Sequence, residues 1–176
     1  EASVNLSLKY FLPENKAPFI KVITNKKTGR QFEAVKGVTV NVYLGEVAED
    51  KLMGKVITAA NGEGRVAFPS SLKASWDSLD IFTVMAESVP AAKEETLSAE
   101  LTIKKAILIL DTASEGGDRT VSAQLKEKRG NEWVAIPEIE IKLKIKRLLG
   151  NLTVGEEEIF TADENGIASS AFVKDA

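Results

Sequence analysis

Residues 29–44 read GRQFEAVKGVTVNVYL, and residues 130–145 repeat the same plan as GNEWVAIPEIEIKLKI. Each copy continues, after a connection, into a second matching stretch: TAANGEGRVAF at 58–68 and TADENGIASSAF at 161–172. A repeat of this length indicates that one structural unit has been built twice within the chain. The repeat describes architecture, and by itself it carries no chemistry.

The positions that match between the two copies are apolar, and their spacing predicts β-strands. The matched pairs, at an offset of 101, are Phe32 and Trp133, Val35 and Ile136, Val38 and Ile139, Val40 and Ile141, Val42 and Leu143, and Leu44 and Ile145. From the third pair onward every second residue is apolar, which is the pattern of a strand with one buried and one solvated face. We therefore expect these side chains, including the aromatic pair Phe32 and Trp133, to pack in the core.

Turn signals and further alternating stretches complete an all-β prediction. Each copy contains an Asn-Gly pair, Asn61-Gly62 and Asn165-Gly166, which predicts a β-hairpin. Ile81 to Ala86 is apolar on both faces and is expected to form a central strand. Thr120 to Lys128 alternates like Val4 to Phe11, so we expect these two strands to be equivalent.

The repeat divides the chain into two antiparallel β-sandwich modules, residues 1–104 and 105–176, with the boundary at Lys104-Lys105. The second module is predicted to be incomplete, because it lacks a counterpart of residues 69–103. Two explanations are open. The gene product continues beyond Ala176, or strand exchange with another chain supplies the missing strand through an open sheet edge.

Composition excludes many chemistries. The chain has no histidine and no cysteine, which removes Ser-His-Asp and Cys-His nucleophiles, zinc knots, cysteine-ligated clusters and histidine-ligated haem. A net charge of -3 argues against a nucleic-acid partner, and no apolar run is long enough for membrane insertion. We expect no catalytic residues and no cofactor. The remaining enzyme alternative uses carboxylates alone and needs two acids in one cleft, roughly 5 to 9.5 Å apart.

Acidic residues gather near predicted turns, but they do not form a recognisable metal loop. The clusters are Glu46, Glu49 and Asp50; Glu156, Glu157 and Glu158; and Asp163 with Glu164. None has the twelve-residue pattern of an EF-hand, in which oxygen ligands alternate around a defined loop. We interpret them as solvated loop charge and predict no metal site.

Two groups of side chains are candidates for surface binding. Lys142, Lys144 and Lys146 lie on the solvated face of one predicted strand and could hold an anionic glycan or an acidic lipid head group. Lysines on an edge strand also protect against aggregation, and we favour that reading. Tyr43 and Trp76 have no aromatic equivalent in the other copy, so they are the better candidates for an exposed aromatic platform.

The order of strand, connection, Thr-x-x-Asn-Gly and strand resembles two families of sandwich module. These are the bacterial immunoglobulin-like modules of the invasin and intimin type and the prealbumin-like domains of carboxypeptidase-regulatory type. The residues that carry the resemblance are Gly37 to Val42 with Thr58 to Gly62, and Pro137 to Leu143 with Thr161 to Ala168. It covers about 40 residues of each module and implies two tandem immunoglobulin-like β-sandwiches displayed at a bacterial envelope, without shared catalytic residues.

The sequence therefore predicts a non-catalytic structural, spacer or interaction region of a membrane-anchored envelope protein, located in the periplasm or at the cell surface. Its partner would be a protein or a glycan. The alternative function is a carbohydrate-binding or other ligand-binding module.

Overall fold

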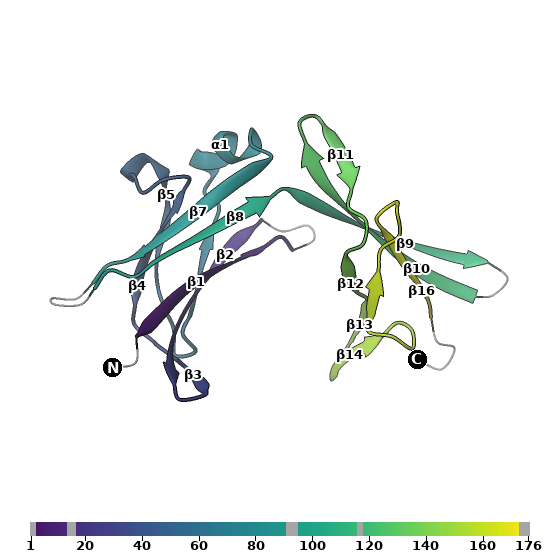
Figure 1. The fold of residues 1–176 in the computed structure, drawn as a ribbon, viewed down its shortest axis with the longest axis horizontal. Coiled ribbons are helices and arrows are strands. Elements are labelled where there is room, and N and C mark those ends of the chain that lie inside the picture. Colours follow the sequence, from purple (N-terminus) through teal and green to yellow (C-terminus); the bar gives the residue numbers. More distant parts are fainter. Residues whose placement is uncertain (1–2, 14–16, 91–94, 116–117, 173–176) are drawn as a thin grey trace. The chain divides into compact units, whose positions relative to one another are not determined.

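A computed structural model describes residues 3–13, 17–90, 95–115 and 118–172. Over these residues the chain is all-β with antiparallel sheets, apart from one short α-helix and two 3₁₀ turns. It divides into two compact units, which we call unit 1 (Glu1–Ile103) and unit 2 (Lys104–Ala176). In Figure 1 the strands of unit 1 run from purple to teal, and those of unit 2 from green to yellow.

Unit 1 contains two four-stranded sheets. In the first sheet β2 is central and pairs with the other three strands: β1 (Val4–Phe11), β2 (Phe19–Thr28), β3 (Gln31–Ala34) and β6 (Glu63–Ala67). The strands of the second sheet, in their spatial order, are β5 (Leu52–Ile57), β4 (Thr39–Leu44), β7 (Ile81–Ser88) and β8 (Ser98–Lys104). The connections contain η1 (Glu49–Lys51), η2 (Ser70–Leu72) and α1 (Lys73–Asp77). The prediction that Ile81 to Ala86 forms a central strand is confirmed, because β7 lies between β4 and β8.

The apolar side chains of the two sheets form one core in unit 1. Val40, Val42 and Leu44 of β4 are buried, which confirms the alternation predicted for this strand. They share the core with Leu6 and Leu8 of β1 and with the inward side chains of β7. Each fully buried aliphatic side chain contributes about 1.5 to 3 kcal/mol. The burial of both inner faces therefore holds the two sheets together.

Unit 2 has two long strands, β9 and β10, and several short ones. They are β9 (Ala106–Glu115), β10 (Asp118–Arg129), β11 (Glu132–Ala135), β12 (Glu140–Lys142), β13 (Lys144–Arg147), β14 (Gly150–Thr153), β15 (Ile159–Thr161) and β16 (Ile167–Ala171). Strand β10 is central in a sheet with β9, β11 and β16, while β12 pairs with β15 and β13 with β14. Ile141 and Leu143 are buried in its core, as predicted, with Ile139 and Ile145 packed against them.

Backbone hydrogen bonds identify the equivalent strands of the two units and correct one prediction. In unit 1 the amide of Val35 donates to the carbonyl of Thr24 in β2 (3.0 Å), and in unit 2 the amide of Ile136 donates to Leu125 in β10 (3.0 Å). Strand β10 is therefore the counterpart of β2, and β9 is the counterpart of β1. The expectation that residues 120–128 match residues 4–11 was wrong, because alternation alone does not distinguish neighbouring strands of one sheet.

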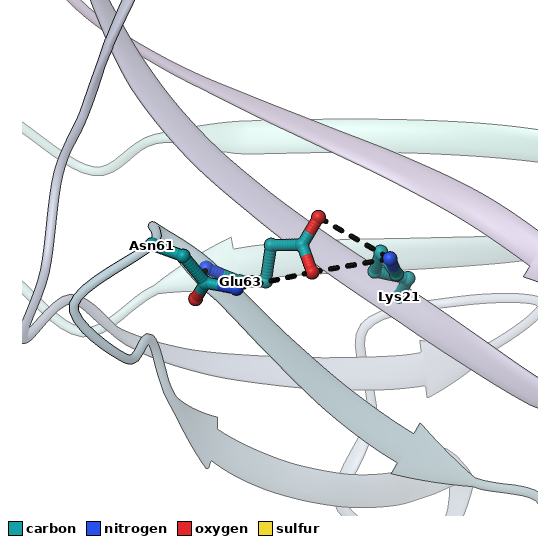
Figure 2. A network of polar contacts seen from close by, with 3 residues as sticks. All are labelled: Lys21, Asn61 and Glu63. Carbon is teal, nitrogen blue, oxygen red and sulfur yellow. Dashed lines mark hydrogen bonds and ion pairs between the residues drawn. The ribbon is translucent and has the colours of Figure 1, made fainter. Parts of the chain in front are cut away.

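The turn at Asn61-Gly62 also differs from the predicted hairpin. The amide of Gly62 donates to the carbonyl of Ala59 (2.9 Å), and the chain does reverse there. However, β5 and β6 on either side of the turn belong to different sheets, so the turn links the two layers. Glu63 fixes the turn, because its carboxylate accepts hydrogen bonds from Lys21 (3.2 Å) and from the side chain of Asn61 (3.3 Å), as Figure 2 shows.

Phe32 and Trp133 are exposed, so the prediction that they pack in the core was wrong. Their side chains are 66% and 42% exposed, respectively. Each lies on a short outer strand, β3 or β11, that pairs only with the end of the long central strand of its sheet, opposite Lys27 or Lys128. All four residues of β3 are exposed, so this hairpin end has no second layer above it.

One backbone position predicts a stabilising substitution. The amide of Gly37 donates to Thr58 in unit 1 (2.8 Å), and Glu138 makes the same bond to Ala162 in unit 2 (3.1 Å). Both residues adopt positive φ, 81° for the glycine and 59° for the glutamate. An L-residue in this region costs roughly 1 kcal/mol, more than the extra freedom that glycine gives to the unfolded chain.

Glu138→Gly is therefore expected to raise the free energy of unfolding of unit 2 by about 0.5 kcal/mol. Urea denaturation followed by Trp133 fluorescence, in a Trp76→Phe background, measures this change. The control is Glu138→Ala, which removes the charge but keeps the strained Cβ, and it should give no gain. Equal stabilisation by both variants would show that charge, and not backbone strain, governs this position.

Candidate functional site

The candidate site is one backbone edge of unit 2, and unit 1 shows how that edge is normally covered. In unit 1, β4 is flanked by β5 and by β7. On the β7 side, the amide of Val89 donates to the carbonyl of Thr39 and the amide of Gly45 donates to the carbonyl of Thr83, both at 2.8 Å. Because backbone groups alternate along an antiparallel strand, the odd-numbered residues of β4 face β7.

Among the residues that the structure describes, the same strand in unit 2 has a neighbour on one side only. Glu140, Ile141 and Lys142 pair with β15 in the register that Thr39, Val40 and Asn41 use with β5. In the described part of the chain, no strand pairs with the opposite side of β12 and β13. We call this side the open edge. By the alternation seen in unit 1, the backbone groups of Glu140, Lys142, Lys144 and Lys146 face it.

The three predicted lysines lie on this strand, where they alternate with core residues. Lys142, Lys144 and Lys146 are exposed, whereas Ile141 and Leu143 are buried. The side chains of the lysines therefore form a row on the outer face of the sheet, beside the open edge. This placement agrees with the general role of lysine in preventing indiscriminate pairing of edge strands.

Glu158 is the carboxylate that balances part of this row. It forms ion pairs with Lys142 (3.7 Å) and, more closely, with Lys144. The hydrogen bond from Lys144 is the main reason why the pKa of Glu158 lies below its ordinary value, and the charges of Lys144 and Lys142 act in the same direction. The site thus combines three ammonium groups with one carboxylate that stays ionised.

A pH dependence follows from this arrangement. A carboxyl group whose pKa is lowered on folding contributes stability above its unfolded pKa of about 4.3, and the contribution is lost as pH falls through the lower folded pKa. We expect NMR titration to give a pKa for Glu158 below that ordinary value. Lys144→Met should raise this pKa more than Lys142→Met does. A larger effect of Lys142 would contradict the assigned hydrogen bond.

The two aromatic candidates, Tyr43 and Trp76, lie on different faces of unit 1. Tyr43 is half-buried on the outer face of β4, next to Leu52 and Met85 on the neighbouring strands. Trp76 is half-buried against the core, with ring centroids 5.2 Å from Phe68 and 6.1 Å from Phe82. The structure therefore does not bring these two rings together into one platform.

Other exposed apolar side chains were not singled out in the sequence. Leu148 and Leu149, at the tip of the β13–β14 hairpin, are fully exposed, and Leu108 and Leu110 of β9 are 55% and 56% exposed. Aligning β9 with β1 would have identified Leu108 and Leu110, since their counterparts Leu6 and Leu8 are core residues.

Some residues of the acidic clusters make defined contacts in the structure. Among the described residues, no three His, Cys, Asp or Glu side chains come close enough to hold a metal ion. Asp163 instead fixes a turn, because its carboxylate accepts hydrogen bonds from the amides of Asn165 and Ile167, both at 2.9 Å. Within the same described part of the chain, none of the helices has the length and apolar character needed to cross a membrane.

Comparisons with known proteins identified no relative. Neither the protein-family models, nor the curated proteins, nor the solved structures contain a match to this chain.

Proposed function

We propose that this chain is a non-catalytic structural and interaction region of a bacterial envelope protein, built from two immunoglobulin-like sandwich modules. In this role it acts as a spacer or docking segment of a membrane-anchored protein, in the periplasm or at the cell surface. The envelope location is inferred from the resemblance of the repeat to envelope modules. The non-catalytic role is inferred from the backbone framework that the two units share.

The observation that carries the proposal is that the units share a backbone framework and not a set of polar side chains. In unit 1 the hydroxyl of Thr24 donates to the carbonyl of Val35 (2.6 Å) and to the hydroxyl of Thr58 (3.2 Å). The equivalent positions in unit 2 are Leu125 and Ala162. Unit 2 has apolar side chains at these two positions, while the equivalent backbone bonds are present in both units, as expected for a scaffold.

Cellular fractionation tests the proposed location. The source cells are separated into cytosolic, periplasmic and membrane fractions, and the chain is detected with an antibody raised against residues 1–176. We expect to find the chain outside the cytosol. If it lies at the cell surface, protease added to intact cells should cleave it. Recovery with a cytosolic marker protein, together with resistance to external protease, would refute the envelope assignment.

The exposed aromatic residues favour a second candidate, a carbohydrate-binding or other ligand-binding module. Phe32 and Trp133 occupy equivalent hairpin positions, and each is exposed next to a lysine of the adjacent strand. An exposed aromatic ring beside a cationic group is suited to stack on a sugar ring and to bind its acidic substituent.

Fluorescence titration of a Trp76→Phe protein with acidic and neutral oligosaccharides tests this candidate, because Trp133 is then the sole tryptophan. Binding should shift the Trp133 emission and saturate. The Lys128→Gln variant should bind acidic sugars more weakly, whereas Lys55→Gln, on another strand, should not differ. An unchanged emission spectrum across the panel would remove this candidate.

A further inference from the structure

The partner strand that the open edge of unit 2 lacks can be described in detail, because unit 1 contains its own copy. In unit 1, β7 pairs antiparallel with β4 through Val40 and Ser88, Asn41 and Glu87, Val42 and Ala86, Tyr43 and Met85, and Leu44 and Val84. Its inward side chains Phe82, Val84 and Ala86 are 3%, 0% and 1% exposed. A strand in the same place on unit 2 would run beside Ile141, Leu143 and Ile145.

Uncovered apolar side chains mark the place that the inner face of such a strand would fill. In unit 1, β1 packs on β7, as shown by the edge-to-face contact of Tyr10 with Phe82 (ring centroids 6.2 Å apart). Leu6 and Leu8 of β1 are 7% and 8% exposed, whereas their counterparts Leu108 and Leu110 in β9 are 55% and 56% exposed. The apolar residues are present in unit 2, but its described residues form no layer like the one that covers them in unit 1.

The lysine row determines the outer face of the partner strand. Lys142 replaces Asn41, which lies opposite Glu87 in unit 1, and Lys144 replaces Tyr43, which lies opposite Met85. Side chains directly opposite each other on one face of a sheet interact, and opposite charges are favourable while like charges are unfavourable. A strand with acidic residues at these positions is therefore preferred over a neutral or basic strand.

The same rule disfavours a second copy of this edge as the partner. Two copies of β12 and β13 that paired antiparallel would place lysines against lysines along the joint. Like charges directly opposite one another destabilise such a pair. The row thus disfavours self-pairing while it permits an acidic partner, which combines attraction and repulsion to give specificity.

We propose that the open edge of unit 2 binds one extended strand of a partner polypeptide, antiparallel to β12 and β13. Alternate apolar side chains of this strand cover Leu108 and Leu110, and acidic side chains between them face Lys142, Lys144 and Lys146. This inference rests on the proposed interaction role and specifies the partner that such a region would take.

A designed peptide tests the proposal on the full chain. The acidic peptide carries the sequence of residues 80–89 with Thr83→Glu and Met85→Glu, while Glu87 is kept. A matched basic peptide carries Thr83→Lys, Met85→Lys and Glu87→Lys. Calorimetry should give one site per chain, with the acidic peptide bound about ten-fold more tightly or better. The preference should weaken at high salt, and amide exchange should slow at residues 139–146.

Protein variants identify the binding surface. In Lys142→Glu/Lys144→Glu protein the preference between the two peptides should reverse. Leu108→Ser/Leu110→Ser should weaken binding of the acidic peptide, whereas Leu12→Ser/Ile57→Ser, which changes two exposed apolar residues of unit 1, should leave its affinity unchanged. All of these side chains except Lys144, which is 40% exposed, are more than half exposed, so the variants are expected to fold.

Two results would overturn the inference. In the first, neither peptide binds and the chain remains a monomer with rapidly exchanging edge amides. In the second, sedimentation shows a dimer whose edge amides are already protected, which assigns the edge to a second copy. The fractionation experiment gives its answer independently, so failure of strand binding can be told apart from failure of the envelope role.

Discussion

Gly62→Ala is expected to lower the free energy of unfolding of unit 1 by about 3 kcal/mol or more, one of the two largest effects of a single substitution that we anticipate. Gly62 has φ of 72°, and a Cβ built there would lie 2.4 Å from the carbonyl oxygen of Thr24. That oxygen accepts the hydrogen bond from Val35, and the amide of Thr24 donates to the carbonyl of Gly62. The added methyl group would therefore separate two backbone segments that hold the sheets together.

The matched control for this prediction is Gly29→Ala. Gly29 has a similar φ of 63°, but no atom lies within 4 Å of the place that a Cβ would take there. Gly29→Ala should lower the free energy of unfolding by roughly 1 kcal/mol, the cost of placing an L-residue at positive φ. Urea denaturation followed by Trp76 fluorescence, in a Trp133→Phe background, measures the free energy of unfolding of both variants. If the two variants lose the same amount, the close approach at Gly62 is not what stabilises the turn.

The second large effect distinguishes the two units. Leu8→Ala is expected to destabilise unit 1 by about 2 to 4 kcal/mol, because it removes a side chain that is only 8% exposed and leaves a cavity in the core. The equivalent Leu110→Ala in unit 2 should cost less than about 1 kcal/mol, because that side chain is 56% exposed.

Binding of the acidic peptide should change this comparison. Once a strand covers β9, Leu110→Ala should reduce the peptide affinity and should cost more stability in the complex than in the free chain. Denaturation of both variants, with and without peptide, measures the difference. A large cost of Leu110→Ala in the free chain would show that β9 is already covered.

The main features of the fold could be predicted from the sequence because the repeat reveals which positions are buried. Val40 and Ile141 were assigned to the core, and both are buried. Phe32 and Trp133 match between the two copies just as well, but they lie where the second sheet does not cover them, and both are exposed. A repeat shows that a position is equivalent in two copies, whereas burial depends on what lies above it.

The candidate site could be predicted only in part. Counting residues after the second Asn-Gly turn indicated an open edge, and the lysine row was visible as alternation. The uncovered apolar face could not be predicted, because recognising it requires knowing that β9 corresponds to β1. That correspondence is set by backbone hydrogen bonds, such as Ile136 to Leu125, which the alternation within a single strand does not record.

Amide hydrogen exchange of the chain without any partner tests the central claim most directly. The amides of Asn41 and Tyr43, which face β7, should be protected, while those of Lys142 and Lys144, at the equivalent positions, should exchange about a hundred-fold faster or more. Equal protection of the two sets in a monomeric sample would contradict the account, because it would mean that the edge of unit 2 is already paired.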